Sequence, residues 1–180
     1  LTLRREEDDK PPPAAAALTH AEYTGRVEDS GLVLEARLTA ESFVEGWTSL
    51  PFMGKNGPGI SEARTGRAVL SRRADGADLL LPGKGVHEIT LKMHAPARHS
   101  GSGGRVTLAL PPAGVSRLTM TVPGTGLAFE TTPAAAHTAE EDATTGATVF
   151  SSFFGSSAEQ VISWSAREVD GLSGMPPGKA

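Results

Sequence analysis

The chain has 180 residues, of which 38% are hydrophobic and 5% aromatic, with 21 glycines, 13 prolines, no cysteine and a net charge of −4. This length allows one sizeable core, and the abundance of turn-forming residues favours many short strands. The composition excludes disulfide frameworks and thiol nucleophiles. The scattered Lys and Arg residues form no basic face for nucleic acid, and no apolar run approaches the ~20 residues of a transmembrane segment.

The N-terminal segment 1–19 has the composition of a linker or extended arm. A run of charged residues is followed by Pro11-Pro12-Pro13 and a stretch of alanines, which favours a stiff polyproline II conformation without a core-forming pattern. This arm is expected to be either solvated or docked on a partner.

Residues 20–130 alternate between apolar and polar side chains, which predicts strands with one buried and one wet face. The clearest example is 103–123, where Pro-Pro-Ala-Gly separates two alternating runs. The inward residues of these two runs are predicted to be Val106, Leu108, Leu110, Leu118, Met120 and Val122. Trp47 and Trp164 also occupy positions typical of core residues.

The rest of the chain is less regular. Residues 131–146 show no periodicity and predict a loop, whereas 147–168 predict a β-hairpin around Gly155-Ser156-Ser157. That hairpin either completes the fold or starts a second module, and 169–180, rich in Gly and Pro, predicts a C-terminal tail. About nine short strands without an amphipathic helix predict an all-β, antiparallel, immunoglobulin- or fibronectin-like sandwich over 20–130. A closed barrel is the alternative.

No group of residues predicts catalysis or a cofactor. His87, His94 and His99 have odd spacings, so neighbouring members point to opposite faces of a strand and form no metal site. The Gly-Lys pairs lack the spacing of a phosphate-binding loop, and Ser102 lacks the pattern of a nucleophile elbow. The sequence therefore predicts that the chain is not an enzyme and holds no metal or cofactor.

Three phenylalanines give the best indication of a partner-binding surface. Because neighbouring residues of a strand point to opposite sides, Phe153 and Phe154 cannot both face one core. Either a second layer covers the outer ring, or that ring belongs to an interface. We therefore take Phe150, Phe153 and Phe154 as candidate partner-binding residues.

Three motifs follow one another along 20–130: Val44-Glu45-Gly46-Trp47-Thr48-Ser49-Leu50-Pro51, Gly85-Val86-His87-Glu88-Ile89-Thr90-Leu91, and Leu108-Ala109-Leu110-Pro111 with Ser116-Arg117-Leu118. This order resembles that of immunoglobulin- or fibronectin-like β-sandwich modules in large, uncharacterised bacterial proteins outside the cytoplasm. The resemblance implies a β-sandwich in a periplasmic or envelope protein, peripheral to the membrane, and it implies no catalytic residues.

Together these observations predict a non-enzymatic structural or protein-binding module outside the cytoplasm. Such a module would be an accessory subunit docked on a membrane protein complex. The alternative is a sandwich that binds carbohydrate or another ligand.

Overall fold

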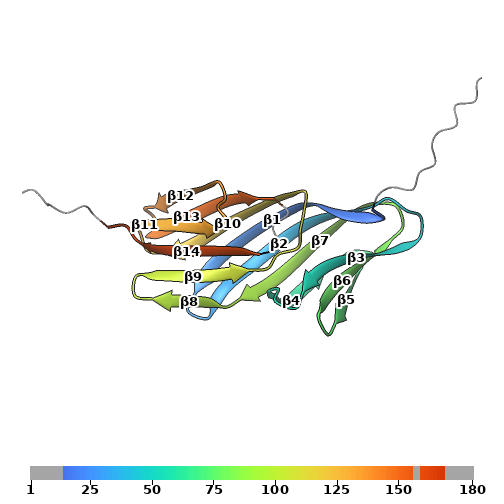
Figure 1. The fold of residues 1–180 in the computed structure, drawn as a ribbon, viewed down its shortest axis with the longest axis horizontal. Helices are drawn as coiled ribbons and strands as arrows, with labels where there is room; N and C mark the ends of the chain where they lie inside the picture. The colour runs from blue at the N-terminus through green and yellow to red at the C-terminus, as the bar shows by residue number, and fades with distance from the viewer. Residues whose placement is uncertain (1–13, 156–158, 169–180) are drawn as a thin grey trace, which may run out of the picture.

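The computed structural model describes residues 14–155 and 159–168, which form fourteen β-strands (Figure 1). These two ranges contain no helix, so the prediction of an all-β protein is confirmed, and they accordingly hold no helix that could span a membrane. The predicted tail 169–180 and residues 1–13 of the predicted arm lie outside the described residues. The strands are β1 (Ala16–Glu28), β2 (Gly31–Ser42), β3 (Trp47–Gly54), β4 (Gly59–Arg64), β5 (Val69–Arg73), β6 (Gly76–Pro82), β7 (Gly85–Ala95), β8 (Ala97–Ser100), β9 (Gly103–Leu108), β10 (Val115–Pro123), β11 (Leu127–Thr132), β12 (His137–Asp142), β13 (Ala147–Phe154) and β14 (Gln160–Ala166).

Seven strands form the largest sheet, in the order β12-β13-β10-β1-β2-β7-β4. Its neighbours are antiparallel except β1 and β10, which run parallel with Tyr23 opposite Leu118. The expected purely antiparallel arrangement is therefore wrong at this pair. The hairpin partner β2 already occupies one edge of β1. The chain returns to the other edge as β10 only after passing through both smaller sheets.

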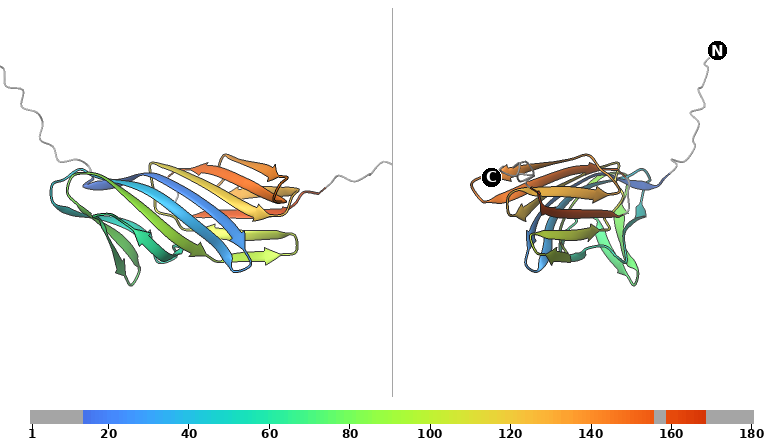
Figure 2. Two further views of the ribbon diagram at one scale, coloured as in Figure 1. Left: turned by 180° about the vertical axis from the view of Figure 1, so that it is seen from behind. Right: turned by 60° about the vertical axis from the view of Figure 1, so that its left-hand side comes forward.

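The two smaller sheets lie on one side of the large sheet. The four-stranded sheet has the order β11-β14-β9-β8, and the three-stranded sheet has the order β3-β6-β5. Figure 1 shows them in front of the large sheet, at its left and right ends, and Figure 2 shows the large sheet uncovered from behind. The structure thus has three sheets in two layers, and the two-sheet immunoglobulin- or fibronectin-like arrangement is not confirmed.

The core lies between these two layers, and strand alternation builds it. Leu32, Leu34 and Leu38 of β2 are at most 2% exposed, as the alternation predicts. Aromatic rings join the four-stranded sheet to the large one: the centroid of the Phe129 ring lies 4.8 Å from that of Phe150 and 6.5 Å from that of Trp164. The inward sets predicted for 103–123 are all buried as well.

Two predictions for the C-terminal third are wrong. The expected loop 131–146 contains β12, an edge strand whose polar side chains are mostly exposed and therefore show no hydrophobic period. The expected hairpin of 147–168 does not form, because β13 pairs with β10 and β12 whereas β14 pairs with β9 and β11. The two strands belong to different sheets, since each fills a position between two strands from elsewhere in the chain.

The two tryptophans differ in burial. Trp164 is 6% exposed, which confirms its prediction as a core residue, but Trp47 is 63% exposed, so that prediction is wrong. Trp47 begins β3, an edge strand of the three-stranded sheet, where Thr48 and Leu50 take the more buried positions. Because successive side chains alternate, this pattern turns the indole outward.

Candidate functional site

One side of the seven-stranded sheet is not covered by either smaller sheet, and we call it the open face (Figure 2). Every second residue of its central strands points there, opposite the core. We define the open face by the outward residues His20, Glu22, Thr24, Arg26, Val33, Glu35, Arg37, Thr39, Glu88, Thr90, Lys92, Val115, Arg117, Thr119, Thr121, Ser151 and Phe153.

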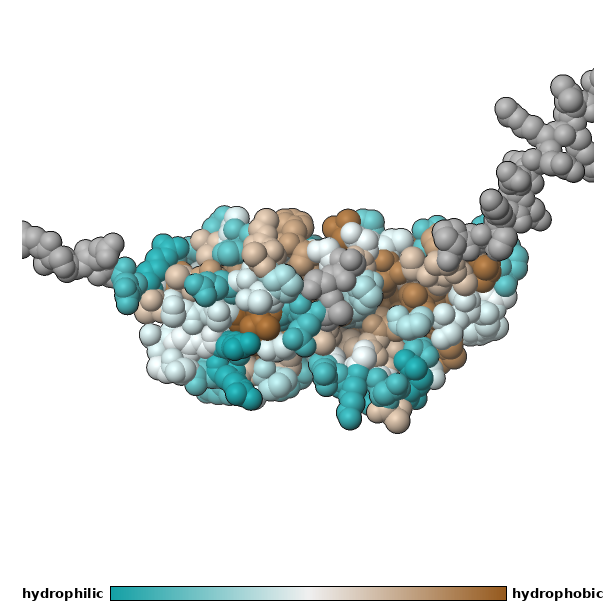
Figure 3. Space-filling view, in the orientation of Figure 1, coloured by the Kyte–Doolittle hydropathy of each residue, from teal (hydrophilic) through white to brown (hydrophobic). Residues whose placement is uncertain are grey.

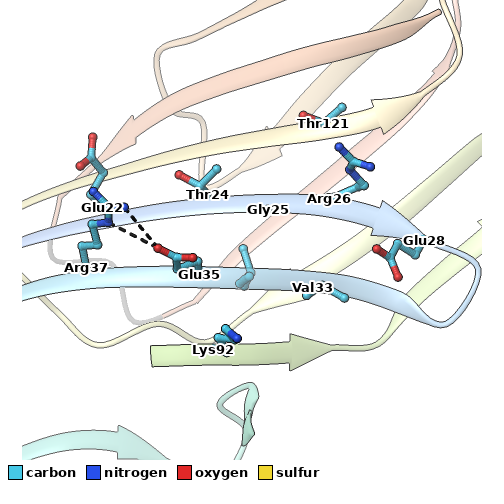
Figure 4. Close-up of a pocket in the computed structure, with 11 residues that line it drawn as sticks. Glu22, Thr24, Gly25, Arg26, Glu28, Val33, Glu35, Arg37, Lys92 and Thr121 are labelled. Carbon is cyan, nitrogen blue, oxygen red and sulfur yellow. Dashed lines mark hydrogen bonds and ion pairs between the residues drawn. The ribbon is translucent and has the colours of Figure 1, made fainter. Parts of the chain in front are cut away.

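Charges of both signs alternate across the open face. In the cross-strand register Glu22 stands between Arg117 on β10 and Arg37 on β2. Arg37 forms an ion pair with Glu35 at 3.4 Å (Figure 4), and Lys92 forms one with Glu62 of β4 at 3.0 Å. Exposed ion pairs of this kind contribute about 0–1 kcal/mol each. Their effect is to make the face polar and nearly neutral.

Shallow hollows lie along the open face. One, of about 660 Å³, is lined by β1 and β2 with Lys92 and Thr121 at its sides (Figure 4). Another, of about 500 Å³, runs from His20 and Glu88 to Phe153. Both are open to solvent and lined mainly by polar and charged side chains. This lining suits contacts with a polar surface rather than enclosure of a small apolar ligand.

The three phenylalanines predicted to bind a partner do not lie on one surface. Phe150 is fully buried and Phe154 is 8% exposed, with its ring stacked against Tyr23 at 6.5 Å between centroids. Phe153 is 56% exposed, and the Arg117 guanidinium lies 5.3 Å from the centroid of its ring. Strand alternation explains the difference. Phe150 and Phe154 are core residues, so a partner-binding role stays a prediction for Phe153 alone.

The neighbouring pair Phe153 and Phe154 provides a direct test of this assignment. Replacing Phe154 by Ser should lower the free energy of unfolding by about 3 kcal/mol or more, because it leaves a cavity and buries a hydroxyl. Replacing Phe153 by Ser should cost less than about 1 kcal/mol, since only an exposed contact with Arg117 is lost. Urea unfolding of both variants measures the difference, and equal losses would contradict the orientation described here.

The three histidines singled out in the sequence have separate surroundings. His87 contacts the Gly83 carbonyl oxygen at 3.2 Å, His94 lies on the open side of β7, and His99 of β8 packs edge-on against Trp164. Within residues 14–155 and 159–168, no three His, Asp or Glu side chains are grouped so as to hold a metal ion.

Among the described residues, Tyr23 and Asp142 have shifted pKa values, and both shifts have structural causes. Burial raises the pKa of the Tyr23 hydroxyl, because it disfavours the charged form. The Thr145 hydroxyl and the Thr144 backbone N–H donate hydrogen bonds to Asp142 and lower the pKa of that carboxyl. This bonding stabilises the turn after β12.

The sequence also lacks the motif His-Glu-x-x-His, which places two zinc-binding histidines one turn apart on a helix, with the Glu as general base. The only His-Glu pair in the chain is His87-Glu88, which lies on strand β7 and has Leu91 at the position of the second histidine. The 180 residues therefore supply no zinc ligands of this type.

The sequence reasoning did not recognise the open face as one surface. The alternating polar residues of 20–28 and 32–39 could have indicated a wet face, but which strands lie beside them follows from the sheet order alone. The contact between Arg117 and Phe153 depends on the pairing of β10 with β13, and no pattern in the sequence around either residue indicates it.

The sequence matches no protein-family model and no curated protein, but its fold is similar to solved structures. An M1 zinc metallopeptidase from Deinococcus radiodurans superposes with a TM-score of 0.53 and 14% identity, over 91% of this chain and 50% of that one. A two-domain M1 zinc metallopeptidase mutant bound to L-tryptophan gives 0.52 and 12%, over 92% of this chain and 51% of that one. Yeast LTA4 hydrolase gives 0.53 and 12%, over 84% of this chain and 29% of that one.

At these identities the likeness shows a shared fold, and the chain spans about half or less of each of these enzymes. The finding contradicts the interpretation of the chain as a non-enzymatic structural or protein-binding module, because the fold recurs in peptidases. It gives no support to the carbohydrate-binding alternative. The all-β chain described here is thus similar in fold to part of the M1 zinc metallopeptidases.

Proposed function

We propose that this chain is the β domain of a peptidase related in fold to the M1 zinc metallopeptidases. The observation that carries the proposal is the extent of the structural match, which takes in 92% of this chain but 51% of a two-domain enzyme. A chain that matches about half of such an enzyme corresponds to one structural unit of it. Low sequence identity leaves the activity itself to experiment.

Under this proposal, the zinc ligands must come from residues outside this sequence. The chain has no His-Glu-x-x-His motif, and its described residues offer no group of three metal-ligating side chains. A zinc-activated water needs such a ligand set. We therefore assign the zinc ligands to a part of the enzyme other than these 180 residues. The β domain supplies a rigid platform beside them.

The test compares the zinc content and peptidase activity of the 180-residue chain with those of the protein that carries this sequence in its natural source. An antibody raised against the chain isolates that protein from its source. Zinc content and hydrolysis of Tyr-Ser-Ala, the peptide bound in a structure of the Deinococcus radiodurans enzyme, are then measured for both. The isolated material should contain zinc and cleave the peptide, should lose activity to 1,10-phenanthroline and should regain it with added zinc.

The 180-residue chain alone is the control and should neither retain zinc nor cleave the peptide. Natural material without zinc and without hydrolysis would overturn the proposal. Hydrolysis by the 180-residue chain alone would overturn the assignment of the zinc ligands to another part of the enzyme.

The location outside the cytoplasm, at the periphery of a membrane, remains a separate prediction that rests on the resemblance to envelope modules. Fractionation of the source organism with the same antibody tests it. Recovery of the antigen with cytoplasmic markers would contradict it.

A further inference from the structure

Two arginines face each other on the outer side of the four-stranded sheet. Arg98 of the edge strand β8 is the direct cross-strand partner of Arg105 on β9, and both side chains are exposed. Figure 3 shows hydrophilic residues at this lower edge of the sheet. Like charges directly opposite on adjacent strands repel and destabilise the pair. An anion bound between the two arginines would offset this repulsion.

The described part of the chain provides none. Neither Arg98 nor Arg105 forms an ion pair or a side-chain hydrogen bond with any residue of 14–155 or 159–168. The acidic residue in the same cross-strand row is Glu130, which lies beyond Ser163 and hence two strands from Arg105. Two strand spacings separate the two backbones by roughly 9–10 Å, and no ion pair joins Glu130 to either arginine. By contrast, Arg73 of the three-stranded sheet pairs with Asp78 at 3.1 Å.

A hollow lies at the two arginines. Pro96, Arg98, Arg105 and Thr107 line it, and its volume is about 430 Å³. It therefore combines two guanidinium groups, each with several N–H donors, with a hydroxyl that can also donate. These groups present hydrogen-bond donors and positive charge to a ligand in the hollow. No carboxylate is among the residues that line it.

From this geometry we infer that Arg98 and Arg105 form an oxyanion-binding site, which takes the carboxylate of a peptide or a phosphate group. A guanidinium presents parallel N–H donors whose spacing matches two oxygens of either group. The bound anion also removes the repulsion between the two arginines. The site lies on the opposite layer from the open face and does not depend on the proposed peptidase relationship.

Thermal unfolding of the 180-residue chain tests the inference, with sodium chloride added to hold ionic strength constant. In about 50 mM phosphate, roughly ten times a dissociation constant of a few millimolar, the chain should melt about 3–5 °C higher than in chloride alone. Acetate, and triglycine compared with triglycinamide, then distinguish a carboxylate ligand from a phosphate ligand. A response to triglycine but not to its amide identifies a peptide carboxylate.

Variants separate the site from general salt effects. Arg98→Gln and Arg105→Gln should each lose the anion response. The control Arg67→Gln, which removes the same charge from an exposed turn, should keep it. Arg98→Glu should melt higher than the natural chain in chloride, because it places opposite charges across the two strands, and it should not respond to phosphate.

The inference is overturned if no oxyanion raises the melting temperature beyond the chloride reference. It is also overturned if Arg98→Gln and Arg67→Gln respond equally, since the stabilisation would then be a general effect of the salt on protein hydration. Neither outcome of this anion-binding test depends on the zinc and hydrolysis measurements that test the proposed function. Failure of one proposal is thus distinguishable from failure of the other.

Discussion

Replacing Phe150 by Ala is expected to lower the free energy of unfolding by about 3–5 kcal/mol, the range seen when a large buried aromatic ring is removed. Phe150 is fully buried on β13, and its ring packs against those of Phe129 at 4.8 Å and His137 at 5.3 Å. The first contact joins the seven-stranded sheet to the four-stranded sheet. Removing the ring therefore weakens the contact between the two layers as well as leaving a cavity.

Urea unfolding measures this loss, and the melting temperature should fall by about 10 °C or more for a domain of this size. Val149→Ala is the matched control, because Val149 is the preceding residue of β13 and points to the opposite, open side, where it is only partly buried. We expect the control to lose less than about 1 kcal/mol. A loss at Phe150 as small as that of the control would show that the two layers are not held together in this way.

Gly76→Ala is expected to destabilise the three-stranded sheet by about 2–4 kcal/mol, because two costs add. Gly76 has a φ of +149°, a conformation that L side chains rarely adopt. A Cβ atom at this position would also overlap the backbone carbonyl oxygen of Met53, on the neighbouring strand β3. Since that oxygen belongs to the backbone, the two strands would have to separate.

Gly66→Ala separates the two costs. Gly66 also has a positive φ, +58°, but an added Cβ would meet no atom within 4 Å. It should lose only the conformational part, about 1–2 kcal/mol. Chemical unfolding of both variants measures the difference, and amide hydrogen exchange should show faster opening of β3 and β6 in Gly76→Ala alone. Equal destabilisation of the two variants would contradict the close approach of β3 to Gly76.

The exposure of Trp47 shows that the sequence of one strand does not determine which of its residues are buried. Its strand alternates, so one set of residues must face inward, and a large aromatic residue is usually in that set. In β3 Thr48 and Leu50 are instead more buried than Trp47, and the strand enters the core through Phe52 and Met53 at its other end. Which of the two alternating sets of side chains faces inward depends on what packs against the strand. The sequence of the strand alone does not contain that information.

Phe153 and Phe154 also show which features strand geometry predicts and which depend on the packing of the sheets. That Phe153 and Phe154 point to opposite sides follows from the backbone of any strand and was predictable. Which of them is buried depended on the four-stranded sheet lying on one side of β13. The Arg98–Arg105 pair depended likewise on the register of β8 with β9, and no sequence pattern indicated it.

What the sequence by itself determined is the class of structure and the inward residues of the regular strands, such as Leu34 of β2 and Leu118 of β10. These features are local, because alternation repeats every two residues and burial of apolar side chains is strongly favourable. The tertiary structure alone decided the division into three sheets, the parallel pairing of β1 with β10 and the separation of β13 from β14. Backbone hydrogen bonds can join almost any two strands, so the choice among partners depends on which apolar faces meet across the whole chain.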